Sequence, residues 1–157
     1  MSRREQRGVA AVELALTAGF LLMLAGGIVE FGHALYSYDI LAKQARAAAR
    51  YMAMRENADP TIEAAMRVEA QNIALCGLPA CGTPPLPGLS ATNVVVATPA
   101  TDNSLANVST GATTGSLDLV SVTITGYTFQ PWIAIPFYTG SLAITFSPIR
   151  VFMPRVS

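Results

Sequence analysis

Few side chains in this sequence could do chemistry, and their spacing does not resemble that of an active site. The chain has one His, His33, and two Cys, Cys76 and Cys81. A structural zinc site needs about four His or Cys ligands, and a redox-active pair is usually C-x-x-C. The sequence has no Ser/His/Asp order with a nucleophile signature, no phosphate-binding glycine loop and no His/Glu metal motif. We therefore expect a protein that is not an enzyme and has no metal and no cofactor.

The two Cys enclose the short sequence Gly-Leu-Pro-Ala, which suits a tight turn. In an oxidising compartment such a pair forms a disulfide. If this region is exported, we expect Cys76 and Cys81 to form a structural disulfide around a loop at 76–81. Free thiols are one alternative, and a periplasmic thiol enzyme that uses both Cys is another. A thiol titration of the native protein separates these cases.

The carboxylate of Glu13 is the one charged group within residues 9–29. As a helix, these 21 residues would span roughly 31 Å, about the thickness of a bilayer core. A carboxylate inside such a segment costs several kcal/mol unless it is neutralised or paired. In an intact chain Glu13 could reach the cytoplasmic interface. Alternatively, a cut between Gly8 and Val9 would create an amino group that could pair with it, and Glu13 would become the fifth residue.

Basic residues predict the orientation of the apolar run. They are Arg3, Arg4 and Arg7. By the positive-inside rule the N-terminus stays in the cytoplasm and residues after about 30 are exported. We expect a basic leader at 1–8 and a transmembrane segment at 9–29. The alternative is an ordinary signal peptide cut near Gly27, but the helical pattern continues past that point.

Composition excludes two further classes of protein. The net charge is zero, and charged residues make up 13% of the chain against roughly 25% in an ordinary soluble domain. A neutral chain lacks the basic face that nucleic-acid binding requires. Its low charge and its 52% of hydrophobic residues argue against intrinsic disorder. What remains is a membrane-attached protein or a small globular domain.

Two rows of residues predict how the N-terminal helix packs. Ala11, Ala15 and Gly19 recur every four residues, and such small residues permit close helix–helix approach in lipid. A second row alternates spacings of four and three, which predicts that the same helix continues through 30–58. Its members are Phe31, Leu35, Tyr38, Ala42, Ala45, Ala49 and Met52. We expect this row to pack on the protein's own sheet or on neighbouring helices.

Residues 59–157 are predicted to form an exported head. Asp59 suits a helix N-cap and Pro60 the first helical position, so a second helix is expected at 60–75. Within the helices we expect two i,i+4 ion pairs, Asp39 with Lys43 and Glu63 with Arg67.

Runs of β-branched and alternating residues predict strands at about 93–98, 117–128 and 141–153. Such strands can form a small antiparallel sheet that packs on a helix. The expected fold class is α+β: a long N-terminal transmembrane helix, a second short helix and a small antiparallel β-sheet head. Four aromatic residues could form an interaction patch or fold onto the long helix, and they are Phe129, Trp132, Phe137 and Tyr138.

The N-terminal third of the chain resembles a known family. A basic leader that ends in Gly8 precedes an apolar segment whose fifth residue is Glu13, which is similar to a type IV prepilin processing site. The sequences Glu30-Phe31-Gly32 and Ala45-Arg46-Ala47-Ala48-Ala49-Arg50 extend the likeness. Together they resemble the TadE/TadG-like minor pilins, or pseudopilins, of the tight-adherence pilus.

This resemblance implies a substrate of a membrane prepilin peptidase that is cut between Gly8 and Val9. It implies that Glu13 then pairs with the amino terminus of a neighbouring pilin and sets the register between subunits. The implied partners are other pilins, the peptidase, the inner-membrane assembly platform and lipid, with no nucleic acid. The implied location is the bacterial inner membrane, with a periplasmic head that is incorporated into a pilus. The alternatives are an uncleaved single-span envelope scaffold and a secreted binding protein with an ordinary signal peptide.

Overall fold

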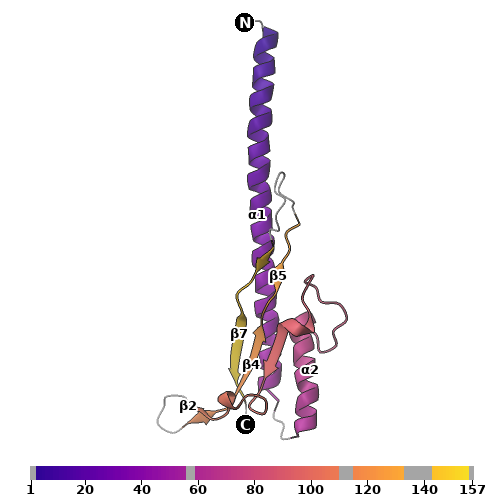
Figure 1. Ribbon diagram of the computed structural model, residues 1–157, viewed down its shortest axis with the longest axis vertical. Coiled ribbons are helices and arrows are strands. Elements are labelled where there is room, and N and C mark those ends of the chain that lie inside the picture. The colour runs from indigo at the N-terminus through magenta and orange to yellow at the C-terminus, as the bar shows by residue number, and fades with distance from the viewer. Residues whose placement is uncertain (1–2, 56–58, 110–114, 133–142, 156–157) are drawn as a thin grey trace. The chain divides into compact units, whose positions relative to one another are not determined.

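The protein has an α+β fold, as the sequence predicted (Figure 1). A computed structural model describes residues 3–55, 59–109, 115–132 and 143–155. Its helices are α1 (Arg3–Ala53) and α2 (Pro60–Cys76), with single 3₁₀ turns at Ala91–Asn93 and Asn103–Leu105. Its strands are β1 (Val94–Ala97), β2 (Val108–Ser109), β3 (Ser116–Leu117), β4 (Leu119–Ile124), β5 (Thr128–Phe129), β6 (Ile144–Thr145) and β7 (Ile149–Pro154).

The chain forms two compact units. One, here called the anchor unit, comprises residues 1–36 and 131–142, and the other, the head unit, comprises residues 37–130 and 143–157. Phe137 and Tyr138 of the predicted aromatic patch lie outside the described residues. Phe129 is buried in the head unit, so the interpretation that it belongs to a surface patch is wrong.

Helix α1 is continuous through Gly26 and Gly27 but ends earlier than predicted. The sequence pattern extended the helix to residue 58, whereas the last helical residue is Ala53. The amide of Arg55 donates to the carbonyl of Met52, which is the tighter hydrogen bond of a terminal turn. The residue before a proline is driven away from helical backbone angles, and Asp59 has an extended backbone. The chain therefore leaves the helix before it starts α2.

Helix α2 begins and ends with capping residues. The Asp59 carboxylate accepts a hydrogen bond from the Thr61 amide at 2.8 Å, and Pro60 occupies the first turn, as predicted. At the other end Gly77 adopts φ +78°, where glycine avoids the strain of a side chain, and its amide donates to the carbonyl of Ile73. A disulfide joins Cys76, the last residue of α2, to Cys81, and the loop it closes contains the Gly77 cap.

The central sheet has three antiparallel strands in the order β1-β4-β7. β4 pairs with β1 from Val94↔Ile124 to Ala97↔Ser121, and with β7 from Leu119↔Pro154 to Ile124↔Ile149. Two short pairs, β2 with β3 and β5 with β6, form separate ladders.

Two of the predicted strands are broken by local chemistry. The run at 117–128 is interrupted at Asp118, whose carboxylate accepts from the Asn107 amide, and again at Gly126, which has φ +68°. The run at 141–153 is interrupted at Pro148, which has no amide to donate to a ladder. β5 and β6 therefore form a separate pair and do not extend β4 and β7.

The core of the head unit is formed by alanines of α1 and aliphatic residues of the sheet. On α1 the buried side chains include Leu41, Ala42, Ala45, Ala48, Ala49, Met52 and Ala53. Facing strands contribute Val94, Val120, Val122, Ile124 and Ile149, and α2 contributes Met66, Ala70, Ile73 and Ala74. Small alanine side chains leave room for close packing of neighbouring elements.

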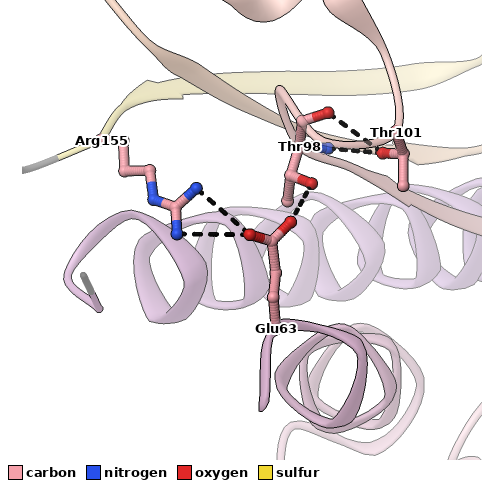
Figure 2. A network of polar contacts seen from close by, with 4 residues as sticks. All are labelled: Glu63, Thr98, Thr101 and Arg155. Carbon is pink, nitrogen blue, oxygen red and sulfur yellow. Dashed lines mark hydrogen bonds and ion pairs between the residues drawn. The ribbon is translucent and has the colours of Figure 1, made fainter. Parts of the chain in front are cut away.

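A buried ion pair connects three elements of the head unit. Figure 2 shows the Glu63 carboxylate between the Arg155 guanidinium and the Thr98 hydroxyl. Both Nη atoms of Arg155 lie 3.5 Å from Glu63 Oε2, and the Thr98 hydroxyl donates to Glu63 Oε1. The predicted pair of Glu63 with Arg67 is wrong, because Glu63 turns into the core and meets a cation that is 92 residues away in sequence.

Candidate functional site

The surface of α1 from Gly8 to Tyr36 is exposed and almost entirely apolar. Within the described residues, α1 is long and apolar enough to cross a membrane by length and composition. None of its residues from 8 to 36 is buried in the structure. Large side chains on this surface include Leu14, Leu16, Phe20, Leu22 and Ile28, and each is more than half exposed. The helix is compatible with a single-pass membrane anchor.

Gly8, Val9 and Glu13 lie on an unobstructed stretch of this helix. A Cβ added at Gly8 would meet nothing within 4 Å. Val9 and Glu13 are one turn apart and share a face, about 6 Å along the axis. The Thr17 hydroxyl donates to the backbone carbonyl of Glu13 at 2.7 Å. This hydrogen bond does not involve the Glu13 carboxylate. Within the described residues, no ion pair is formed by the Glu13 carboxylate.

The predicted packing rows divide into exposed and buried parts. Ala11, Ala15 and Gly19 are exposed, and no described element covers them. In the longer row, Phe31 and Leu35 are more than half exposed, so for these two only the second expectation, packing on neighbouring helices, stays a prediction. Tyr38 is 44% exposed, and its ring meets the Phe146 ring edge-on with centroids 5.7 Å apart. Ala42, Ala45, Ala49 and Met52 are buried in the head unit, as the first expectation, packing on the protein's own sheet, required.

Sequence reasoning missed a cluster at the end of the apolar segment. The backbone amide of Trp132 donates to Glu30 Oε1 at 2.8 Å, and the Trp132 ring lies against the His33 ring with centroids 3.7 Å apart and planes tilted by 32°. His33 Nδ1 and Glu30 Oε2 are 3.8 Å apart. Trp132 thus contacts the long helix, as one of the two interpretations predicted, yet 75% of it remains exposed. The separation of about a hundred residues between Glu30 and Trp132 hides this contact from any local pattern.

One further predicted ion pair lies within α1. Asp39 and Lys43 form the predicted i,i+4 pair at 2.6 Å, and both side chains are at least half exposed. Within the described ranges, no group of three His, Cys, Asp or Glu side chains could hold a metal ion.

Comparison with known proteins identifies part of this surface. The sequence model of a family described as TadE-like protein matches residues 8–50, a segment that begins at Gly8 and includes Glu13. No curated protein and no solved structure matches the chain. The resemblance to a TadE-like, pilus-associated family is thereby confirmed for this segment.

Proposed function

We propose that this chain, whose residues 8–50 are TadE-like, is a minor pilin, or pseudopilin, of a tight-adherence pilus. The observation that carries the proposal is the exposed apolar helix with a carboxylate near its start, located within the family match. In this proposal the chain has no chemistry of its own. It acts in pilus assembly, priming or adhesion through contacts with other pilins and with the assembly platform.

The first proposed step is cleavage between Gly8 and Val9 by a prepilin peptidase at the cytoplasmic face of the inner membrane. Hydrolysis of this peptide bond by water leaves a carboxylate on Gly8 and a free amine on Val9. Three arginines and one glutamate leave with residues 1–8, so the net charge of the chain falls from zero to −2. Loss of this basic leader removes the groups that hold the N-terminus in the cytoplasm.

The second step uses the new amine. A carboxylate at the centre of a bilayer-spanning helix costs about 2.5–3.5 kcal/mol on insertion scales. The Val9 amine and the Glu13 carboxylate, each costly to bury alone, are tolerated in an apolar environment as a pair. We propose that Glu13 pairs with the amino terminus of a neighbouring subunit as the chain leaves the bilayer. This pair would define the register between adjacent helices, and the small residues at positions 11, 15 and 19 would permit their close approach.

Cleavage can be tested by co-expression with a prepilin peptidase and mass spectrometry of the membrane-bound product. The expected mature chain starts at Val9 and is absent when the peptidase lacks a catalytic aspartate. Gly8→Leu should abolish cleavage, while Gly27→Leu should not affect it. The two variants are matched, because a Cβ at either glycine meets nothing within 4 Å and both sites are helical.

The same experiment discriminates the alternatives. A signal peptide would give the reverse pattern, with a cut near Gly27 that Gly27→Leu blocks. An uncleaved envelope scaffold would keep its N-terminus in every strain. Either result would overturn the pilin proposal.

A further inference from the structure

The rim of the apolar segment, residues 30–36 of α1, is shielded by apolar or aromatic groups on every side. Successive helical residues are about 100° apart. Relative to His33, Glu30 and Tyr36 lie about 60° to either side, and Phe31 and Leu35 lie on the opposite face. Phe31, Leu35 and Tyr36 are each more than half exposed. Only the face that carries Glu30 and His33 is polar in sequence.

Trp132 covers that polar face. Its ring lies against the His33 ring and its amide donates to Glu30, and the Glu30 and His33 side chains are 17% and 16% exposed. The Trp132 ring itself is exposed. A carboxylate and an imidazole at the end of the apolar segment are therefore screened by an indole that faces outward. All of these residues belong to the anchor unit.

We propose that Phe31, Leu35, Tyr36 and Trp132 form an interfacial collar that lies in the headgroup region of the outer leaflet of the membrane that α1 spans. The collar goes beyond the pilin function proposed above and does not depend on it. It assigns a lipid contact to Trp132, a residue outside the helix and outside the family match.

The length of α1 supports lipid as the occupant of this surface. Seventeen residues separate Glu13 from Glu30, which corresponds to about 26 Å of helix. Positions 31–36 lie about 27–35 Å beyond Glu13. A hydrocarbon core is about 30 Å thick. When the Glu13 carboxylate is at the cytoplasmic boundary, the collar is therefore at the opposite boundary.

The chemistry and the arrangement of the collar support the same occupant. Tyr and Trp concentrate at membrane–water interfaces, because their rings are apolar and their OH or NH groups are polar. A second protein would cover one side of a helix, whereas lipid surrounds it, and the collar is apolar or aromatic on all sides. The collar also continues the exposed apolar surface of α1 without interruption. In the sequence around Trp132, no charged residue occurs between Asp118 and Arg150.

The single Trp of the chain allows a direct test by fluorescence. The full chain is reconstituted into phosphatidylcholine vesicles that carry bromine either near the headgroup or near the end of the acyl chain. We expect headgroup-proximal bromine to quench the Trp132 emission several-fold more than chain-end bromine. We also expect iodide in the aqueous phase to quench it weakly compared with the urea-unfolded chain.

The matched control moves the indole to the head unit. In the double variant Trp132→Phe with Val95→Trp, the indole replaces an exposed residue of β1, and we expect iodide to quench it while brominated lipid does not.

Three results would overturn the collar. Trp132 could be quenched by iodide and not by lipid, quenched most by chain-end bromine, or protected from both quenchers. None of these bears on cleavage at Gly8, so the failure of the collar and the failure of the pilin proposal are distinguishable.

Discussion

The two parts of helix α1 differ in how their side chains are packed. Residues 9–36 carry large apolar side chains that are exposed, whereas residues 37–53 bury mainly alanines against the rest of the head unit. Residues 37–53 are packed by the chain itself, because their small side chains fit against a sheet of the same chain. The first part has no such cover in the described residues, and its exposed apolar surface is compatible with a membrane anchor. One helix therefore joins a head that has its own core to an exposed apolar segment.

The same contrast separates two glutamates. Glu63 is buried, and its carboxylate is neutralised within the chain by Arg155 and accepts a hydrogen bond from the Thr98 hydroxyl. Glu13 lies on an apolar surface, and no cation pairs with it among the described residues. A carboxylate in an apolar environment requires a cation. The head supplies its own, and in the pilin proposal the cation for Glu13 is the amino terminus of a neighbouring subunit.

The largest expected effect is the loss of pili in Glu13→Ala. Removal of one partner of a buried charge pair costs about 2–5 kcal/mol, so pilus yield should fall about tenfold or more. Sheared-pilus preparations and electron microscopy measure the yield, and alkaline extraction should show unchanged membrane insertion. Asp39→Asn is the control, because it removes a carboxylate of the same helix from an exposed ion pair. Normal piliation in Glu13→Ala would remove Glu13 from the mechanism.

The next largest expected effect is a loss of stability when Glu63 loses the cation that pairs with it in the head. Arg155→Met should lower the free energy of unfolding of the head by about 3–5 kcal/mol, because it leaves the buried Glu63 carboxylate unpaired. Urea unfolding in detergent, followed by near-UV circular dichroism, measures the change. Adding Glu63→Gln should restore most of the loss. If the double variant is as unstable as Arg155→Met, the ion pair does not explain the effect.

A smaller effect should distinguish the two parts of α1 by packing alone. Ala45 is fully buried, so Ala45→Leu should overpack the core and cost about 1–3 kcal/mol. The matched change Ala11→Leu, at an exposed alanine of the same helix, should leave the unfolding of the head unchanged. Equal effects at both sites in the same urea titration would contradict the division of the helix.

The smallest effect is a pH dependence that belongs to the head. Hydrogen bonds from the Thr61 hydroxyl and amide lower the pKa of Asp59 below its usual 3.8, and those from Ser104 do the same for Asp102. Since these pKa values are lowered by folding, their stabilisation is present above the unfolded pKa and is lost as the pH falls through the folded pKa. Unfolding midpoints should therefore decrease below about pH 5. Asp59→Asn with Asp102→Asn should flatten this dependence, since Asn also caps helices.

Much of the fold follows from local pattern. The apolar run and the four-three spacing predicted α1, and the Asp59-Pro60 pair predicted the start of α2, because capping and periodicity depend on neighbours in sequence. Local signals for the broken strands were also present. Gly126 and Pro148 are residues that interrupt strands, yet the alternation of residues on both sides predicted strands that run across them.

Other features depended on contacts between distant residues. The cation that meets Glu63 is 92 residues away, although Arg67 stands one turn along the same helix. Trp132 and Glu30 are 102 residues apart. The helical spacing of residues 31–52 is uniform, so the spacing alone does not mark the point where exposed residues give way to buried ones.

By itself, the sequence determined that a long apolar helix with an early carboxylate precedes an α+β head, because composition, spacing and capping are properties of neighbouring residues. Only the tertiary structure decided which part of that helix the head covers, which cation neutralises Glu63, and that Trp132 screens Glu30 and His33. Each of these depends on where strands and loops return to a helix many residues earlier. Burial and ion pairing therefore stabilise the protein only once those strands and loops have folded back onto the helix.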